Sequence, residues 1–418
     1  MLHIKTMLPV KDAENIILNL VNPLQGGQDR ETVNLLTASG RILAQTVTSS
    51  LDFPHWDNSA MDGYAVRFAD VKNCSPENPV ILDIIEEIPA GYQPKLTIKS
   101  GQTARIFTGA VMPNGADTIV IQEETRRERD RVWILASPKP KAFVRYQGEY
   151  YHAGNPLLTP GIILNAPEIA ILAAAKCTEI PVYRRLRVTI LATGDELVSP
   201  DKPLQASQIV DSNSYALASA LISMGIEPIM LGIIPDQKDL LKGAISQAIS
   251  LADVVLSTGG VSVGDYDYIE EILSSLGGTI HIKSVAVKPG KPLTVATFNN
   301  EKSTLYFGLP GNPVSTLVTF WRFVQPALRK MSGMIPELWN PVFVKARSRF
   351  DLKSDGKRES YVWGKLQLVD GMYEFDLAGG SQSSGNLINL AQTTGFAMLP
   401  IGQKLIPQGE WVQVLKLS

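Results

Sequence analysis

The sequence has few cysteines, no long apolar run and no excess of charge of either sign. Its two cysteines, Cys74 and Cys177, cannot build a disulfide framework and lack the paired spacing of a zinc or iron–sulfur site. No apolar segment approaches the roughly 20 residues of a membrane-spanning helix, and residues 1–14 lack the apolar core of a secretory signal. These absences predict a cytoplasmic protein in a reducing compartment, with no membrane partner.

The balance of charge points to a small partner. Lys and Arg number 39 against 41 Asp and Glu, so the formal net charge is −2. Without a global basic field, nothing favours a nucleic-acid partner, and a small molecule is the better expectation. At 418 residues, 44% of them hydrophobic, the chain is too long for one core and is expected to form three or four domains.

In the first half of the chain the expected secondary structure changes twice, from helical to β and back to helical. Residues 11–22 and 31–36 are expected to be helical. Residues 51–142 then alternate in short apolar runs punctuated by Gly and Pro, which predicts a small β domain. A helical pattern resumes at 166–176. The segments 1–50 and 143–183 are therefore expected to form one discontinuous α/β linker domain into which the β domain is inserted.

From residue 184 the pattern alternates between strands and helices, which is typical of a parallel sheet covered by helices on both faces. The expected strands are 188–192, 228–234, 253–257, 281–287 and 304–307, and the expected helices are 214–224, 239–250, 268–276 and 314–331. Residues 184–333 should therefore be a three-layer α/β domain. Residues 334–418 return to alternation and predict a C-terminal β domain that resembles a barrel.

Polar loops follow several of these strands, at the edge where open α/β sheets bind ligands. They are TGDEL at 193–197, PD at 235–236, TGGVSVGDYD at 258–267, KPGKP at 288–292 and LPGNP at 309–313. Glycines such as Gly259 and Gly260 let the backbone approach a phosphate. One such loop alone would be ordinary turn chemistry, but several on one edge favour a binding site.

The charges in these loops suit a metal and an oxyanion. Lys288 and Lys291 flank a Pro-Gly pair, and the carboxylates Glu196, Asp236 and Asp267 are expected to converge on the same edge. Carboxylate oxygens suit Mg²⁺, and ammonium groups suit oxyanions. The residues by themselves therefore predict a site for a metal and a phosphate or another oxyanion.

Six strings carry a resemblance to a known family. They are DNSAMDGY at 57–64, TGA at 108–110, TGDEL at 193–197, GGVSVGDYD at 259–267, KPGKP at 288–292 and LPGNP at 309–313. Their order resembles that of the molybdopterin molybdenumtransferases, namely the bacterial MoeA proteins and the E domains of gephyrin and of its plant counterpart. The resemblance spans nearly the whole chain, and it supplies the function.

The resemblance implies a four-domain, elongated homodimer. Each cleft would combine the α/β molybdopterin-binding domain of one subunit with the inserted β domain of the other. The family inserts molybdate into adenylylated molybdopterin, with Mg²⁺-dependent release of AMP, and gives molybdenum cofactor. A molybdopterin adenylyltransferase and molybdoenzymes are the implied protein partners. The preference between molybdate and tungstate stays open.

The resemblance also implies roles for individual residues. Asp236 and Asp267 would handle Mg²⁺ and phosphate, with Glu196 nearby. From the inserted domain, Asp62 and Thr108 would take part in catalysis.

The remaining implied roles concern substrate binding. Gly259, Gly260 and Ser262 would bind the pterin phosphate region, and Arg145 would reach the cleft from the inserted domain. Lys288, Lys291 and Ser384 would bind molybdate.

Some assignments keep a second interpretation. Asp195 is as good a helix N-cap as a ligand, and Arg145 is as good a surface charge as a binding group. The chain also departs from its relatives at Tyr150, Ser284 and Trp363, where charged residues are common; Lys283 and Arg358 are the nearest substitutes for the last two.

Two other functions are compatible with parts of the sequence. A molybdopterin adenylyltransferase would use the same α/β domain, but such proteins usually lack both β domains. A non-catalytic pterin carrier would not need to retain the carboxylates and lysines of the predicted site, although a fold alone never proves activity.

Overall fold

The computed structural model describes residues 7–260, 268–299 and 303–417. The chain forms two compact units. Unit 1 comprises Met1–Gln45, Pro160–Ala166 and Glu179–Ser418, and unit 2 comprises Thr46–Thr159 and Pro167–Thr178. Within the described residues, no helix combines the length and the apolar composition needed to cross a bilayer.

A six-stranded sheet forms the centre of the α/β domain in unit 1. Its strands lie in the order β16 (Glu227–Ile234), β13 (Arg187–Thr193), β17 (Val254–Thr258), β21 (Thr304–Leu309), β20 (Pro292–Phe298) and β18 (Thr279–Ser284). The first four run parallel, whereas β20 is antiparallel to both of its neighbours. The expected parallel sheet therefore contains one antiparallel strand, β20, which was not among the expected strands. Too few residues separate β20 from β21 for a helical crossover, so the two pair as a hairpin.

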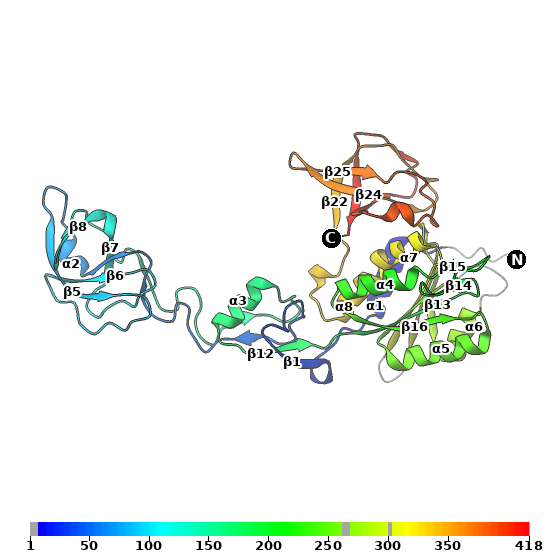
Figure 1. Cartoon of the computed structure of the whole chain (residues 1–418), viewed down its shortest axis with the longest axis horizontal. Coiled ribbons are helices and arrows are strands. Elements are labelled where there is room, and N and C mark those ends of the chain that lie inside the picture. Colours follow the sequence, from blue (N-terminus) through cyan, green and yellow to red (C-terminus); the bar gives the residue numbers. More distant parts are fainter. Residues whose placement is uncertain (1–6, 261–267, 300–302, 418) are drawn as a thin grey trace. The chain divides into compact units, whose positions relative to one another are not determined.

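Helices cover both faces of this sheet, as Figure 1 shows. One face carries α5 (Lys238–Leu251) and α6 (Ile269–Ser275). The other carries α1 (Val10–Leu20), α4 (Asn213–Ser223), α7 (Pro313–Thr319) and α8 (Gln325–Met331), the last two joined by a π-helical turn at Phe320–Val324. The expected three-layer α/β architecture is confirmed.

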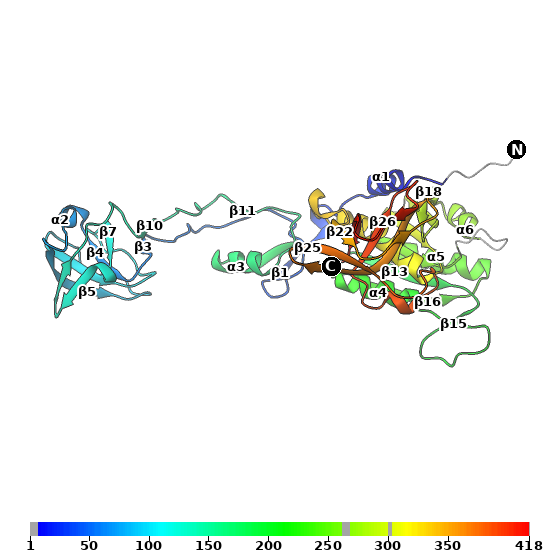
Figure 2. The same cartoon turned by 90° about the horizontal axis from the view of Figure 1, so that it is seen from above.

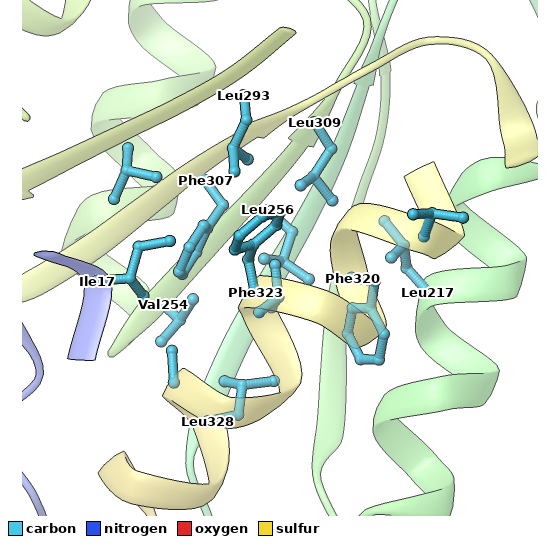
Figure 3. Packing of buried hydrophobic residues seen from close by; sticks show 14 of the residues in the cluster. Ile17, Leu217, Val254, Leu256, Leu293, Phe307, Leu309, Phe320, Phe323 and Leu328 are labelled. Carbon is cyan, nitrogen blue, oxygen red and sulfur yellow. The ribbon is translucent and has the colours of Figure 1, made fainter. Parts of the chain in front are cut away.

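Alternating side chains of the central strands build the two cores. Val254, Leu256 and Phe307 point to one face, where they pack with Phe320 and Phe323 of the helical turn (Figure 3). The intervening residues of the same strands face α5 and α6; they include Val255 and Tyr306. Full burial of each such side chain stabilises the fold by about 1.5–3 kcal/mol, so both faces hold the sheet firmly in place.

The C-terminal part of unit 1 is a closed β barrel. Its strands are β22 (Phe343–Ser348), β24 (Glu359–Val369), β25 (Met372–Leu377), β26 (Gly395–Leu399) and β28 (Trp411–Lys416). They pair in the order β24, β25, β22, β28 and β26, and β26 pairs back onto β24. A short strand of the α/β domain, β19 (Val287–Lys288), adds to β24 in parallel. The start of the 288–292 loop is therefore fastened to the barrel.

Unit 2 contains the inserted β domain, whose sheet Figure 2 shows with its short helix α2 (Phe68–Val71). The strand order is β7 (Thr118–Ile121), β4 (Gly63–Val66), β6 (Gln102–Ile106), β5 (Val80–Ile88), β9 (Arg131–Ile134) and β8 (Thr125–Glu128). Two small pairs accompany it, β3 (Asn58–Ser59) with β10 (Val144–Arg145) and β2 (Val47–Thr48) with β11 (Pro156–Leu158), and α3 (Ala166–Ala174) also belongs to the unit. The expected β domain is confirmed.

The prediction of a helix at residues 31–36 is wrong. Residues Arg30–Asn34 form strand β1, which pairs in antiparallel fashion with β12 (Glu179–Tyr183). A helix of six residues has too few hydrogen bonds to offset its nucleation, whereas the strand gains a partner that lies far along the chain. The domain boundaries expected from the sequence stay predictions.

Candidate active site

The loops that follow β13, β16, β17 and β21 enclose a cavity of about 390 Å³ at the carboxyl edge of the sheet. We call it the carboxylate cavity. It is lined by Thr193, Gly194, Glu196, Leu197, Ile209, Asn213, Asp236, Thr258, Gly259, Gly260, Pro292, Pro310, Gly311, Asn312 and Ser315. The structure thus brings together Glu196, Asp236 and the two glycines 259 and 260. Ser262 and Asp267, which were assigned to the same site, lie outside the described residues.

Two acidic side chains, Glu196 and Asp236, line this cavity, and the charge of a third, Asp195, acts on Asp236. The pKa of Asp236 is raised, first by partial desolvation and then by the negative charges of Asp195 and Glu196. The backbone N–H of Asp236 donates a 3.1 Å hydrogen bond to the Asp195 carboxylate. The N-cap interpretation of Asp195 is wrong, because the chain continues into strand β14 (Leu197–Val198), which pairs with β15 (Ile209–Val210). Asp195 instead joins the loop after β13 to the loop after β16 through this hydrogen bond.

Gly259 is required by packing as well as by conformation. Its φ is +83°, and a Cβ at this position would lie 2.2 Å from the carbonyl oxygen of Thr193. The end of β17 therefore approaches the end of β13 too closely for any side chain. Gly259 and Gly260, directly after β17, both line the cavity.

Asn213 is a cavity residue that the sequence analysis missed. Its side-chain amide donates a 2.7 Å hydrogen bond to the carbonyl of Gly311, which joins the start of α4 to the loop after β21. One signal could have revealed it. Asp211 and Ser212 precede Asn213 directly before an apolar helical run, and this is the pattern of a helix start. The Asp211 carboxylate accepts the N–H of Ser214 at 3.1 Å.

A second cavity of about 500 Å³ lies next to the first and shares Pro292, Asn312 and Ser315 with it. We call it the cation pocket. Its basic lining residues are Lys288, Lys291, Lys353 and Arg358, and its polar lining residues include Gln382, Ser383 and Ser384. The structure therefore places Lys288, Lys291 and Ser384 around one pocket. The Ser384 hydroxyl accepts a 3.2 Å hydrogen bond from the Asn312 amide.

The two lysines of this pocket are not equivalent. The Lys288 ammonium lies 2.9 Å from the carboxylate of Asp355, whereas Lys291 has no ion pair among the residues that the structure describes. The 288–292 loop connects β19 to β20. Since β18 and the start of β20 lie at the carboxyl edge, the loop still reaches the site.

The positions where the chain departs from its relatives, Tyr150, Ser284 and Trp363, differ in burial and in their neighbours. Trp363 is fully buried, and its indole N–H donates a 2.9 Å hydrogen bond to Asn389. Arg358 lines the cation pocket, but Lys283 is engaged by Glu270 of α6 and does not line either cavity. Tyr150 is exposed. Only Arg358 supplies a cationic group to the pocket near one of the substituted positions.

Unit 2 brings its own assigned residues together. One oxygen of the Asp62 carboxylate accepts hydrogen bonds from the Thr108 N–H at 2.8 Å and from the Thr108 hydroxyl at 2.7 Å. These two bonds lower the pKa of Asp62, the backbone bond most strongly. Arg145 of β10 lies opposite Asn58 of β3 in the antiparallel pairing of these two strands. Within the described chain its guanidinium has no partner, so both interpretations of Arg145 stay open.

Comparison with known proteins places this geometry in a family. Residues 8–175 match the MoeA N-terminal region (domains I and II), residues 189–330 a probable molybdopterin-binding domain, and residues 345–417 the MoeA C-terminal region (domain IV). The chain is 60% identical over 417 residues to a molybdopterin molybdenumtransferase of Nostoc sp., an alignment that covers 100% of this chain and 95% of that protein. The chain belongs to the molybdopterin molybdenumtransferases.

Other relatives agree with this assignment. A molybdopterin molybdenumtransferase of Haemophilus influenzae is 34% identical over 393 residues, covering 92% of this chain and 93% of that protein. The crystal structure of a molybdopterin biosynthesis MoeA protein from Pyrococcus horikoshii superposes with a TM-score of 0.83 at 29% identity, covering 98% and 99% of the two chains. The chain is therefore an enzyme of molybdenum cofactor biosynthesis that transfers molybdenum. A separate adenylyltransferase and a non-catalytic carrier are not supported.

Proposed function

We propose that the enzyme uses adenylylated molybdopterin, cleaves its pyrophosphate link with the help of Mg²⁺ when molybdate arrives, and releases AMP and molybdenum cofactor. The observation that supports this proposal is the contact between the two cavities, which share Pro292, Asn312 and Ser315. A site rich in carboxylates and a site rich in cations thus adjoin at one edge of the sheet. Such a pair suits a phosphate-bearing substrate and an oxyanion that must react with each other.

The carboxylate cavity has the chemistry that Mg²⁺ requires. Partial desolvation and then the repulsion of Asp195 and Glu196 raise the pKa of Asp236, and a divalent cation would relieve this excess of negative charge. Asp236, together with Asp267 of the following loop, would hold the ion. The described residues contain no group of three or more metal-binding side chains. Mg²⁺ commonly binds one or two carboxylates and completes its shell with water and substrate phosphates. When bound, it would neutralise charge on the phosphates as AMP leaves.

The protein groups would orient the two substrates. Gly259 and Gly260 present backbone next to the carboxylate cavity, where they and Ser262 would bind the pterin phosphate region. In the cation pocket Lys288, Lys291 and Ser384 would bind molybdate, a tetrahedral dianion. The boundary between the cavities would then bring the molybdate and the pterin together, which is the positioning that such a transfer needs.

We also propose that the enzyme acts as a homodimer with shared clefts. Asp62 and Thr108 form a hydrogen-bonded pair in unit 2, and the family resemblance assigns this pair, together with Arg145, to the cleft of the second subunit. The two hydrogen bonds from Thr108 hold Asp62 in its charged form, which supports a role toward a cationic or hydrogen-donating group. A molybdopterin adenylyltransferase and molybdoenzymes would be the proteins before and after this step.

Release of AMP tests the proposal. The protein is incubated with adenylylated molybdopterin, Mg²⁺ and molybdate, and AMP is measured over time. Asp236→Asn should lower the rate on the order of 10²-fold, because it keeps the shape of the side chain but removes a charge that the cation needs. Asp267→Asn should do the same. Asp201→Asn is the matched control, since Asp201 is exposed and does not line either cavity. Wild-type turnover of Asp236→Asn at saturating Mg²⁺ would remove Asp236 from the mechanism.

A further inference from the structure

One carboxylate, that of Asp355, forms an ion pair with a lysine that lines the cation pocket. Asp355 lies between Ser354 and Arg358, which both line the pocket, and its Oδ2 atom is 2.9 Å from the Lys288 ammonium. A carboxylate at this position is unexpected in a pocket that is proposed to bind an anion. It lowers the net positive charge that an incoming oxyanion would meet.

The loop that carries Asp355 is held in place by backbone hydrogen bonds. The second carboxylate oxygen accepts the N–H of Lys357 at 2.9 Å. On the two sides of Asp355, the N–H of Ser354 donates to the carbonyl of Lys404 at 3.0 Å, and the carbonyl of Gly356 accepts the N–H of Gly402 at 2.8 Å. These hydrogen bonds hold the turn of the barrel in the position in which Asp355 contacts Lys288.

The electrostatic setting keeps this carboxylate charged. Its hydrogen bond with Lys288 is the largest influence that lowers the pKa of Asp355, and the charge of Arg358 acts in the same direction. The Arg358 guanidinium also donates to the carbonyl of Val287 at 3.3 Å, next to Lys288. Among the described residues, Lys288 is thus the cation of the pocket that is ion-paired with Asp355, whereas Lys291 has no ion pair.

We propose that Asp355 is a resident counter-ion of the cation pocket, which occupies Lys288 until an oxyanion displaces it, and which thereby sets the affinity and selectivity of the pocket. This inference rests on the proposed molybdate site. A dianion can replace the single charge of Asp355 at Lys288 and still satisfy Lys291, whereas a monoanion can only exchange one charge for another. The competition therefore favours molybdate over chloride and other monoanions.

Two other roles for Asp355 make opposite predictions. If it orients Lys288 for binding, its loss should weaken molybdate binding. If the pair is an ordinary exposed ion pair, its loss should change little, because the side chains of Lys288 and Asp355 are 46% and 33% exposed. Of these three roles, only that of a counter-ion that competes with the ligand predicts tighter molybdate binding after the Asp355 carboxylate is neutralised.

The test is direct binding of molybdate to the full-length protein by calorimetry, without pterin. Asp355→Asn keeps an oxygen acceptor for the Lys357 N–H and removes only the charge. We expect its molybdate Kd to fall by at least about threefold, in the range of one half-exposed ion pair. Inhibition of binding by chloride should become stronger in the same variant. Asp351→Asn is the control, because Asp351 lies in the same module and accepts the Gln408 N–H at 2.9 Å, away from the pocket lining.

The outcomes separate this inference from the proposed function. An unchanged or raised Kd in Asp355→Asn overturns the counter-ion. Lys288→Ala should raise the Kd at least about tenfold, and adding Asp355→Asn to it should then give no gain. If Lys288→Ala leaves the Kd unchanged, the proposed molybdate site fails, whatever Asp355→Asn does. Loss of binding in Lys288→Ala with no change in Asp355→Asn rejects the counter-ion alone.

Discussion

Asp236 shares the carboxyl edge of the sheet with Asp195 and Glu196, and the three side chains repel one another when all are ionised. The local hydrogen bond does not remove this repulsion, because Asp195 accepts the backbone N–H of Asp236 and leaves both carboxylate charges in place. Partial desolvation is the largest cause of the raised pKa of Asp236, and the repulsion adds to it. The cavity is therefore a site where a proton and a divalent cation compete for the same carboxylate.

This competition predicts a pH dependence at the residue scale. Since the pKa of Asp236 is raised, its carboxylate takes up a proton at a higher pH than an ordinary aspartate, and Mg²⁺ affinity should weaken as the pH falls through that value. Asp195→Asn keeps an acceptor oxygen but removes a like charge, so the pKa of Asp236 should fall. The acid limb of Mg²⁺-dependent AMP release should move to lower pH in this variant. Half-saturating Mg²⁺ concentrations measured across the acid range would show it.

Asp201→Asn provides the comparison for this shift, because it removes one negative charge from an exposed position outside both cavities. Its acid limb should coincide with that of the wild type. An acid limb in Asp195→Asn that stays in place, or that moves to higher pH, would show that Asp195 does not act on Asp236.

At the scale of elements, the ends of β13 and β17 approach each other more closely than side chains allow. Gly259 meets the Thr193 carbonyl oxygen, and the positive φ adds a second restriction. The two restrictions can be separated, because Gly277 after α6 has nearly the same φ of +82° but nothing within 4 Å of an added Cβ. The chain thus contains its own control for backbone conformation.

We expect Gly277→Ala to lower the free energy of unfolding by about 1 kcal/mol, which is the usual cost of an unfavourable φ. Gly259→Ala should cost at least about 3 kcal/mol, because the new Cβ would also displace a strand end in a closely packed sheet. Chemical denaturation of both variants, followed by intrinsic tryptophan fluorescence, provides the comparison. Equal losses for the two would mean that the close approach at Gly259 relaxes without cost.

At the scale of the whole molecule, Arg322 joins three parts of unit 1. It lies in the π-helical turn between α7 and α8, and its guanidinium bonds both carboxylate oxygens of Glu14 in α1, at 2.8 and 3.1 Å. Its Nε–H donates to the Tyr361 hydroxyl of the barrel at 3.0 Å. The side chain is 9% exposed. One buried cation therefore connects the N-terminal helix, the α/β domain and the barrel.

Arg322→Met should destabilise unit 1 by about 3–5 kcal/mol, because it leaves the Glu14 carboxylate without its partner in a largely buried setting. Arg349→Met is the matched control. Arg349 also faces two carboxylates in unit 1, but it is 53% exposed, so its loss should cost less than about 1 kcal/mol. Adding Glu14→Gln to Arg322→Met should recover part of the loss. A strictly additive double variant in denaturation experiments would argue against a coupled pair.

The proposed homodimer makes a prediction at the same scale. An Asp62→Ala subunit and an Asp267→Asn subunit carry defects in different domains, so a mixed dimer should contain one cleft with both residues intact. Mixing the two inactive variants and allowing subunits to exchange should therefore restore AMP release to a part of the wild-type rate. Mixed dimers that form, as shown by differently tagged subunits, but stay inactive would reject the shared cleft.

Much of the α/β domain was predictable, because its signals are local. Segments rich in β-branched and apolar residues, such as 188–192 and 253–257, are long enough for buried strands. The polar residues directly after them must lie at one edge of the sheet. Glu196, Asp236 and Gly259 could thus be placed in one cavity from the sequence. Their roles came from the resemblance of the linked motifs to a family.

The features that could not be predicted all depend on contacts between residues that lie far apart in the chain. Strand β1 exists because β12 pairs with it, and β20 reverses the sheet because β21 follows too soon for a crossover. Neither partner is visible in a local pattern.

By itself, the sequence determined which polar loops follow the parallel strands β13, β16, β17 and β21, and which glycines and charged residues they carry. The tertiary structure alone decided that Asp355 faces Lys288 across 67 positions and that Arg322 reaches Glu14 across 308. The physical reason is that the residues around a charged side chain in the sequence do not show which distant residue will pair with it. Pairing at about 3 Å depends on how β19 joins the barrel and how α1 packs on the sheet, and these arrangements follow from the burial of whole elements.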